Sequence, residues 1–575
     1  MAIVLYLNNS QLYPASGQNI KLTRENPYFT QSESYTLEVT VPMDILENRQ
    51  FFSNIQRIDA SKRPPSYQCR MIVDNRPVLT GTAKVTQVTQ SEVKLQLLGG
   101  RSEVNFLSEN EYIDELPLGV SVGFLVTYPE DIQLATSYVN DETNGGYRSI
   151  YQFGLVDLAM RIIDYYGFTV EECTINTTPW NKLYVASARN VIDVSHVLPH
   201  WTPREFFEEF CNFFNVTIVT DEMRRTARIV GTPTFFNSTD PIRIEPADEY
   251  SAEMNDEQDG SLASDDLTFE LSNSAHHDYD SIPEDIRDGA PATEYANYSA
   301  AKAAYDAMTG DEGKEQIFRC PVGSFTGWDH DYTDVGEQVP RRLFTQIDVF
   351  APLVRNNDGA GETKLKICPV AMAEEEYEVT FGTGDGAHTI RRWFHLPSLE
   401  KPLGDERFAR TSGFGASRSS GTADEGSTIQ EYIEGDAELD SEAEKGDLLE
   451  VMFIDDMEQT YFIEDSRSGS STDTASIGFT DWQYKKNHAG NEHRHWSLSL
   501  NPTNAEHYLG QLHQNGFTFN MKARLQFKFL SGTIPDPTRV YIIRNKRYGC
   551  LKIEANISDD GIDRLMTGYF YEMLS

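Results

Sequence analysis

The sequence predicts a β-rich α+β protein of several domains, with two β-barrel-like domains and intervening α/β helix–strand units. Apolar and polar residues alternate with a period of two near both ends of the chain, as they do in half-buried strands. Between these ends, two segments have apolar residues at helical spacing directly after helix-start signals. At about 150 residues per domain, a chain of 575 residues has room for about three to five domains.

The N-terminal part, 1–118, is predicted to be a β-barrel-like domain. Two runs of alternating apolar residues predict its strands: Tyr35, Leu37, Val39 and Val41, and then Val93, Leu95 and Leu97. Gly99 and Gly100 are expected to end the last of these strands. A small sandwich or barrel fits this pattern.

The next part, 119–250, is predicted to hold two helix–strand units. Ser149 with Gln152, and Thr202 with Glu205, have the spacing of a capping box and therefore predict two helix starts. Apolar residues at helical spacing follow each start: Leu155, Leu158, Ala159, Ile162, Ile163 and Tyr166, and then Phe206, Phe207, Phe210, Phe213 and Phe214.

Both predicted helices are expected to end alike. Gly167 and Asn215 follow the last apolar residues, and these residue types tolerate the left-handed conformation that ends many helices. A strand containing threonine follows each of them. We interpret the two segments as a duplicated α/β unit with an offset of 48 residues. Two unrelated amphipathic helices are the alternative.

The second half is predicted to alternate acidic excursions with β structure. An acidic insertion over 251–310 includes a short Ala-rich helix over 291–308, and a β-rich domain over 311–400 has strand-like pieces at 343–350, 364–368 and 377–381. A flexible Gly/Ser-rich and acidic excursion spans 401–447. The C-terminal β domain, 448–575, alternates as the N-terminal one does, at Leu525, Phe527 and Phe529 and at Leu551, Ile553, Ala555 and Ile557.

Charge and cysteine content exclude several classes of protein. The chain has 49 basic and 89 acidic residues, and its net charge of −40 repels phosphate, which argues against a general nucleic-acid binder. No apolar run is long enough to cross a membrane, and the start has no secretory signal, so synthesis in the cytoplasm is expected. The six cysteines form no C-x-x-C pair and are expected to be mostly buried free thiols.

No catalytic, cofactor-binding or metal-binding residue is predicted. The segment from His488 to His493 has one residue too many for an H-x-x-E-H zinc motif, and Gly490 disfavours its helix, although His493 and His495 would share one face of a strand. Four other motifs are better explained as turns or loops, namely Gly382 to Gly386, Asp329 to Asp334, Asp559 to Asp563 and Gly413 to Ser417.

Segments near both ends resemble phage tail hub proteins encoded by viruses and prophages of Bacteroides-like bacteria. The segments that carry the resemblance are Leu5 to Asn8, Ile20 to Pro27, Tyr35 to Pro42, Tyr548 to Glu554 and Gly568 to Tyr571. The resemblance implies two β-barrel-like domains interleaved with two α/β domains. It also implies a homotrimer in which six barrels form a pseudo-sixfold ring, adapting a sixfold tail tube to a threefold tip.

The function expected from this resemblance is that of a structural tail-tip, or baseplate, hub protein of the virion tail. Its expected partners are the tail tube or distal tail protein, the tape measure protein, and spike or tail fibre proteins. DNA would pass only in transit, and part of the negative charge would face the channel to repel it. A tail-associated cell-wall hydrolase or endopeptidase is the first alternative, and a carbohydrate-binding surface protein is the second.

Overall fold

The computed structural model describes the chain in long stretches near both ends and in shorter pieces between them. It describes residues 3–60, 66–118, 133–141, 146–186, 198–237, 240–254, 266–269, 292–294, 317–320, 323–326, 331–332, 338–339, 343–345, 362–370, 372–381, 388–397, 448–455, 459–484, 494–500 and 505–574. The protein is β-rich, with several sheets and few helices. No described helix is both long and apolar enough to span a membrane.

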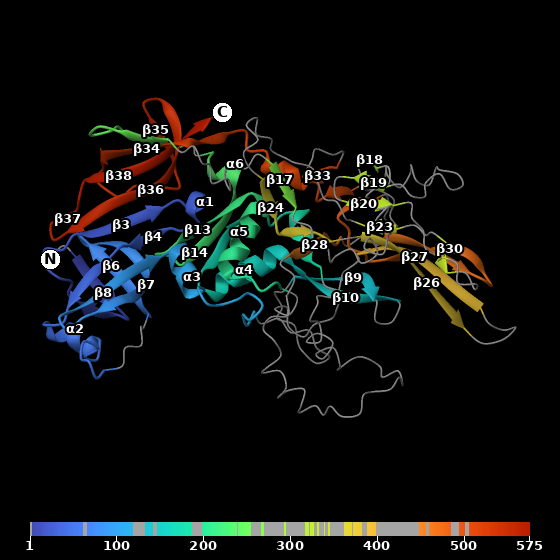
Figure 1. Ribbon diagram of the computed structural model, residues 1–575, viewed down its shortest axis with the longest axis horizontal. Helices are drawn as coiled ribbons and strands as arrows, with labels where there is room; N and C mark the ends of the chain where they lie inside the picture. Colours follow the sequence, from blue (N-terminus) through green and yellow to red (C-terminus); the bar gives the residue numbers. More distant parts are fainter. Residues whose placement is uncertain are drawn as a thin grey trace.

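Strands from the two ends of the chain lie side by side at one end of the molecule, with the main helices beside them (Figure 1). The N-terminal set consists of β1 Ile3–Leu7, β2 Ser10–Leu12, β3 Ile20–Glu25, β4 Ser34–Thr36, β5 Val39–Pro42, β6 Ser66–Val73, β7 Arg76–Val88 and β8 Glu92–Gly99. The C-terminal set consists of β15 Ile242–Arg243, β16 Ser251–Met254, β34 Thr518–Leu530, β35 Val540–Ile543, β36 Lys546–Ser558, β37 Gly561–Ile562 and β38 Leu565–Leu574.

These fifteen strands form one continuous sheet, called here the terminal sheet. Its hydrogen-bonded order is β16-β34-β38-β36-β3-β4-β8-β7-β6-β1-β2, with the remaining strands paired off this path. The two sets join where β3 pairs antiparallel with β36, so that Leu22 lies opposite Ala555. In the described part of the chain the path has two ends and does not close into a barrel.

Each set of strands encloses its own apolar cluster. The N-terminal cluster includes fully buried side chains such as Leu5, Leu22, Val41 and Leu95. The C-terminal cluster includes Phe529, Tyr541, Ile553 and Phe570, with Ile244 from the segment before β16. The terminal sheet therefore bends around two cores and not one.

Two predicted strands differ from the expected alternation because β-bulges shift their phase. Tyr35 lies opposite Leu98 but Val39 lies opposite Leu95, so β4 and β5 contain one residue more than their partner over this stretch. Thr36 is consequently buried and Leu37 is 55% exposed, the reverse of the prediction. A similar shift occurs in β36 after Cys550, and the buried positions there begin at Ile553 instead of Leu551.

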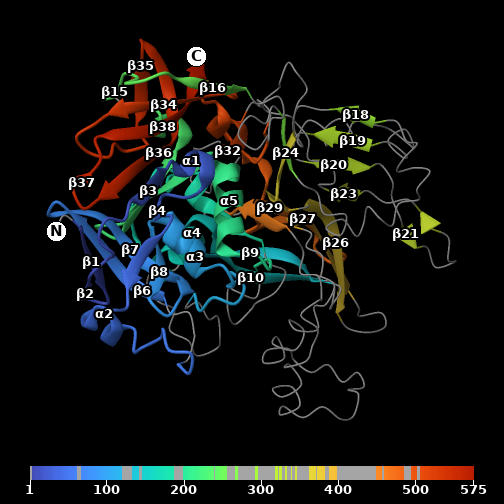
Figure 2. The same cartoon turned by 60° about the vertical axis from the view of Figure 1, so that its left-hand side comes forward.

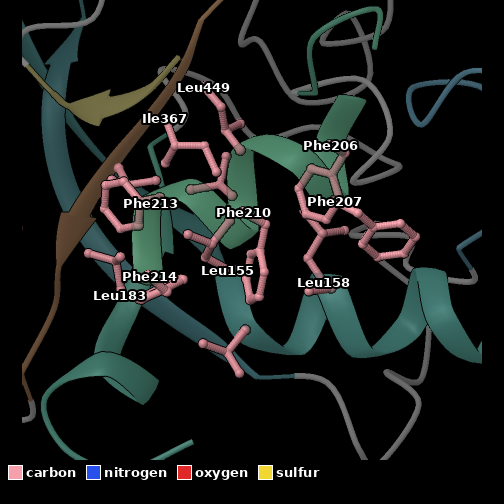
Figure 3. Close-up of a cluster of buried hydrophobic side chains, with 14 of the residues drawn as sticks. Leu155, Leu158, Leu183, Phe206, Phe207, Phe210, Phe213, Phe214, Ile367 and Leu449 are labelled. Atoms are coloured by element: carbon pink, nitrogen blue, oxygen red, sulfur yellow. The ribbon is translucent and has the colours of Figure 1, made fainter. Parts of the chain in front are cut away.

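The helical layer beside the terminal sheet is built around two helices. The elements of this layer are α4 Leu155–Tyr165, β11 Thr169–Cys173, α5 Pro203–Phe214, β13 Val216–Asp221, β14 Thr226–Gly231 and α6 Thr232–Phe235. Every apolar position predicted for α4 and α5 is buried. Figure 3 shows the five phenylalanines of α5 together with Leu155 and Leu158 of α4. Burying one such side chain contributes about 1.5–3 kcal/mol, so this cluster is a main source of stability.

The two predicted helix starts have different outcomes. Thr202 caps α5 with a complete capping box: its hydroxyl accepts the Glu205 amide, and the Glu205 carboxylate accepts the Thr202 amide at 2.8 Å. The prediction at Ser149 is wrong. Ser149 lies opposite Tyr138 in the pair formed by β9 Leu134–Asp141 and β10 Gly146–Gly154, and α4 begins only after Gly154. Pairing with β9 overrides the local capping signal.

The two helix ends are confirmed. Gly167 has a φ of +79° and Asn215 a φ of +50°, and both therefore adopt the left-handed conformation. The strands that follow, β11 and β13, flank β14 in a three-stranded sheet, with β11 parallel and β13 antiparallel to β14. The duplication remains an interpretation of this likeness.

Two further sheets lie beyond the helical layer. A five-stranded sheet has the order β25-β28-β12-β10-β9, with β12 Leu183–Val185, β25 Ile367–Pro369 and β28 Leu449–Phe453. A four-stranded antiparallel sheet contains β26 Met372–Phe381, β27 His388–Pro397, β29 Gln459–Asp465 and β30 Gly469–Ala475. These sheets lie beyond the helices, away from most of the terminal sheet (Figure 1).

Shorter elements connect these parts. The helical ones are α1 Pro27–Thr30, α2 Leu46–Phe51, α3 Arg101–Leu107 and the 3-10 turns η1 Trp180–Lys182 and η7 Leu509–His513. The strands are β17 Asp266–Phe269, β18 Ala292–Glu294, β19 Ile317–Cys320, β20 Gly323–Thr326, β21 Asp331–Tyr332, β22 Gln338–Val339, β23 Leu343–Thr345, β24 Glu362–Leu365, β31 Asp481–Tyr484, β32 Arg494–Ser497 and β33 His507–Tyr508.

The predictions for 251–447 are only partly within the described residues. Strand-like pieces appear as predicted at 343–345, at 364–368 and at 377–381, whereas 346–350 lies outside the described residues. The helix expected over 291–308 is wrong where it can be seen, because 292–294 forms β18 and pairs parallel with β19. Pairing with β19 thus places Ala292, Thr293 and Glu294 in a strand and not in the predicted helix. The remainder of that segment and the excursion over 401–447 lie outside the described residues.

Candidate assembly surface

The motifs considered as chemical sites are only partly within the described residues. Asp559 and Asp560 form the turn between β36 and β37, which ends at Gly561 with a φ of +105°. The residues from Gly382 to Gly386 lie outside the described part, but the flanking strands pair antiparallel up to Phe381 and His388, as the predicted hairpin requires. Of the segment Asp329 to Asp334, the structure describes β21, which pairs with β22. Gly413 to Ser417 lies outside the described residues.

The histidine-rich segment forms no metal site among the residues that the structure describes. His488 and His493 lie outside them, and His495 lies in β32, opposite Gln483. No group of three His, Cys, Asp or Glu side chains in the described ranges is close enough to hold a metal ion. In the described part of the chain, no disulfide bond involves Cys69, Cys173, Cys211, Cys368 or Cys550.

One histidine, His200, is oriented by a carboxylate, as the catalytic histidine of many hydrolases is. His200 Nδ1 lies 3.0 Å from Asp114 Oδ1, and its ring stacks on Tyr112 with 3.6 Å between the centroids. A carboxylate that orients an imidazole is one half of a hydrolytic triad. The described hydrogen bonds of the His200 ring go to Asp114, and no described serine, threonine or cysteine bonds to this ring. The pair therefore supplies no nucleophile.

The more informative surface is the C-terminal edge of the terminal sheet. All four residues of β16 are exposed, and β16 is held to β34 by antiparallel pairing, with Ala252 opposite Leu525. Tyr250 precedes this strand and Met254 is its last residue, and they have 59% and 73% of their surface exposed. A strand at the edge of a sheet offers unpaired N–H and C=O groups to another strand. This edge is therefore suited to pairing with a second chain.

The other edge of the same sheet is formed by the N-terminal set. Ser10 and Gln11 of β2 are exposed, and β2 pairs with β1 at the end of the strand path. The short helix α2 packs beside β2, and its Leu46 is 57% exposed. Figure 2 shows β16 and β2 at opposite ends of the terminal sheet. Each chain thus offers two different edges, formed by β2 near the start of the sequence and by β16 in its middle.

The outer face between these edges is covered by charges that neutralise one another. Glu253 of β16 pairs with Arg524 of β34, and the Arg524 guanidinium lies 5.5 Å from the ring centroid of Tyr569 on β38. Lys552 of β36 lies 4.6 Å from the same ring. This row of contacts crosses four strands and fixes their outward side chains.

The row continues across the junction of the two strand sets. Glu554 accepts from Lys21 of β3 at 2.8 Å and from Lys552 at 3.1 Å. Burial raises the pKa of Glu554, but the two lysine ammonium groups outweigh it and hold the pKa below its usual value. Glu554 therefore stays ionised and ties β36 to β3 through a charge pair in addition to the backbone ladder.

An aromatic cluster holds the terminal sheet against the helical layer. The Phe236 ring, just after α6, lies 4.8 Å from that of Tyr28 on α1 and 5.0 Å from that of Phe519 on β34. The ring centroid of Phe29 lies 5.1 Å from that of Phe519 and 5.4 Å from that of Tyr571 on β38. Burial raises the pKa of Tyr28. These aromatic contacts consequently hold the terminal sheet, which includes both edges, in a fixed position against the helical layer.

Sequence reasoning did not identify this cluster or the two edges. The available signal for the cluster was the group of aromatic residues at Phe235, Phe236, Phe517 and Phe519, but nothing local shows that the first two and the last two lie together. No comparable signal marks β16, because it lies in a run of acidic residues that resembles a solvated loop. Its place at the edge depends on pairing with a strand more than 260 residues away.

Comparisons with known proteins add solved structures of low similarity. No protein-family model and no curated protein matches the chain. A 43 kDa tail protein from prophage MuSo2 of Shewanella oneidensis has a TM-score of 0.34 at 8% identity, covering 99% of this chain and 96% of its own. A tail protein from Neisseria meningitidis MC58 has a TM-score of 0.33 at 8% identity, covering 99% and 96%. The Francisella PdpA-VgrG complex in its lidded form has a TM-score of 0.24 at 8% identity, covering 100% and 80%. TM-scores below 0.5 do not establish a shared fold.

Proposed function

We propose that the chain is a structural tail-tip hub protein of a phage or phage-like particle, assembled as a ring of three copies. The observation that carries this proposal is the terminal sheet, in which the N-terminal and C-terminal sets of strands form a continuous wall that ends, among the described residues, at β2 on one side and at β16 on the other. Each strand set has its own apolar core and so supplies one wall segment. The resemblance of the segments near both ends to tail hub proteins supports the same assignment.

The two free edges favour a closed ring. β16 of one copy and β2 of the next are different surfaces, so the contact between copies is heterologous. Heterologous contacts produce either a closed ring or an open filament, and closure leaves no edge exposed. With two segments per chain, three copies supply six barrel-like segments, which is the number needed to meet a sixfold tube.

The partners follow from this position in the tail. One face of the ring would bind the tail tube or distal tail protein, together with the tape measure protein, and the other would bind spike or fibre proteins. DNA would pass through the centre without binding. The balanced charges on the described outer face of the terminal sheet do not form an acidic wall. We therefore expect carboxylates elsewhere in the chain to face the channel.

The alternative from another class is a tail-associated cell-wall hydrolase or endopeptidase. The observation that favours it is the Asp114–His200 pair. Incubating the purified protein with cell walls and assaying for released fragments separates the two functions. Release that is lost in His200→Gln would contradict a purely structural role.

The ring proposal predicts that a charge at either edge prevents assembly. Met254→Lys in β16 and Leu46→Lys in α2, beside β2, each place an ammonium group in the contact between copies, where its burial is strongly disfavoured. Light scattering on the purified chain should give three times the mass of one chain for the wild type, and the mass of one chain for each variant.

The matched control is Tyr165→Lys, which adds the same charge at a residue of α4 that is 43% exposed and outside the terminal sheet. This variant should remain trimeric. A wild-type chain that stays monomeric at every concentration, or edge variants that still form trimers, would contradict closure through these edges.

A further inference from the structure

The hairpin formed by β13 and β14 inserts its tip into the terminal sheet through polar contacts. Thr220, at the end of β13, donates its backbone N–H to Glu33 Oε1 at 2.9 Å, and its hydroxyl donates to the same carboxylate. The Arg101 backbone N–H, at the start of α3, donates to Glu33 Oε2 at 2.9 Å. A buried carboxyl on the terminal sheet therefore binds the hairpin and α3 together.

Two residues further along the tip, Glu222 approaches the backbone of the sheet. A Cβ atom at Gly99 would overlap the Glu222 carboxyl group, so only glycine permits this approach. The backbone of Thr80 on β7 hydrogen-bonds the same carboxyl group. The Thr80 hydroxyl also lies 3.1 Å from the sulfur of Met223. Glu222 thus contacts the sheet at Thr80 of β7 and at Gly99, the last residue of β8.

Arg225 closes the tip on its other side. It pairs with Glu103 of α3 and donates to the Tyr166 carbonyl oxygen at 3.2 Å. Its guanidinium also lies 4.0 Å from the ring centroid of Phe168. Arg225 has a φ of +57°, so the hairpin turns sharply at this residue. The tip is therefore held at both of its sides, with Glu222 between them.

Of the arginines near Glu222, two use their side chains to bind other polar side chains. Arg225 pairs with Glu103, and the Arg101 side chain donates to Gln31 at 3.0 Å. The remaining cation is Arg24 of β3, which donates to the Val78 carbonyl oxygen at 3.1 Å. Its Nε is buried and has no hydrogen-bond partner in the described part of the chain.

The electrostatic consequence is a carboxyl group that favours its neutral form. Burial, together with the charges of Glu33 and Glu103, raises the pKa of Glu222 to about 8, because Arg24 only partly opposes these effects. Burial also raises the pKa of Glu33, against the hydrogen bonds from Thr220 and Arg101. Cys69 of β6, facing Glu103 and Glu222, has its pKa raised by burial and by these two carboxylates. The other charged residues of the tip, Asp221 and Arg224, are exposed.

We propose that the β13–β14 hairpin is an acid-tightened latch between the terminal sheet and the helical layer: seating the tip binds a proton on Glu222, and releasing the tip gives that proton up. The proposed edges of the ring belong to the terminal sheet, and the helical layer connects that sheet to the other sheets of the molecule. The latch consequently couples pH to how firmly these two parts are held together, whatever the assembly in which the chain acts.

The pH dependence has a definite sign. In the released tip Glu222 is solvated and titrates near its ordinary value of 4.5, whereas in the seated tip its pKa is about 8. The seated state is therefore fully favoured below about pH 4.5 and loses up to about tenfold in its equilibrium constant per pH unit until about pH 8. Above that pH both states are ionised and the dependence ends.

Hydrogen exchange on the full chain tests the latch. Protection factors of the backbone amides at 220–225, corrected for intrinsic exchange, should fall with rising pH between about 5 and 8 and then level off. Glu222→Gln mimics the protonated form. In this variant the protection factors should fall less steeply with pH, by up to about tenfold per pH unit less than in the wild type. Glu171→Gln, at an exposed residue of β11 that pairs with Arg224, should keep the wild-type dependence.

A second variant tests the geometry without altering a charge. Gly99→Ala should push the Glu222 carboxyl out of the sheet, lower the protection of the tip at every pH and flatten the pH dependence. Gly532→Ala, at a glycine with open space around it, should behave as the wild type. A pH dependence in Glu222→Gln as steep as that of the wild type, or a Gly99→Ala chain with wild-type protection, would overturn the latch.

Discussion

Single polar side chains connect parts of the molecule that are far apart in sequence. Asn26 caps α1 through its Oδ1, which accepts the Tyr28 amide at 3.1 Å. Its Nδ2 donates to the carbonyl oxygens of Pro537 and Cys550, each at 3.0 Å, and its backbone N–H donates to the Leu551 carbonyl oxygen at 2.9 Å. One fully buried residue therefore joins the N-terminal set of strands to the C-terminal set.

Replacing Asn26 should destabilise the terminal sheet more than a typical surface change. Asn26→Ala leaves two buried carbonyl oxygens without their donor, and each unsatisfied group costs about 1–3 kcal/mol. Chemical unfolding should show a loss of about 2–5 kcal/mol in the free energy of unfolding. Asn237→Ala, at an exposed residue after α6, should change it by less than about 0.5 kcal/mol. Equal losses in both variants would show that Asn26 does not join the two strand sets.

At the scale of elements, sequence patterns correctly predicted the features that depend on interactions between residues close together in the chain. The apolar positions of α4 and α5, the capping box at Thr202 and the left-handed ends at Gly167 and Asn215 all depend on neighbours within a few residues, and they are confirmed. The predicted start at Ser149 failed because pairing with β9 competes with the cap. Alternation failed at Leu37 because a one-residue bulge changes which face each side chain occupies.

The end of α5 makes a second pH dependence testable. His513 Nε2 donates to the Phe213 carbonyl oxygen at 3.0 Å, and burial lowers the pKa of this histidine to about 4 from an ordinary value of 6.5. Its contribution to stability is therefore fully present above about pH 6.5. It is lost progressively as the pH falls towards 4, and the loss is at most about 3 kcal/mol.

The measurement is the free energy of unfolding between pH 7 and pH 4 for the wild type and for His513→Gln. The variant cannot gain a charge in the core, so its stability should fall less steeply with acid. His507→Gln, at a partly exposed residue of β33, is the control and should follow the wild type. A steep loss that is identical in all three chains would exclude His513 as its source.

At the scale of the whole molecule, the joining of the two chain ends is the feature that sequence could not supply. Alternation indicated strands near both ends, but nothing local shows that Leu22 lies opposite Ala555, because the chemistry of a ladder is the same for any two strands. The same is true of β16, whose partner β34 lies far along the chain. The domain limits predicted from composition stay predictions. The absence of a predicted catalytic constellation also stays a prediction.

The central claim is that each copy contributes two wall segments to one ring, and the symmetry of the assembled tail tip tests it most directly. Imaging of intact tips at a resolution that separates strands should show three copies around the channel. The N-terminal and C-terminal strand sets should alternate in one layer, with β16 of each copy beside β2 of the next. Six copies per ring, or the two strand sets in different layers, would contradict the claim.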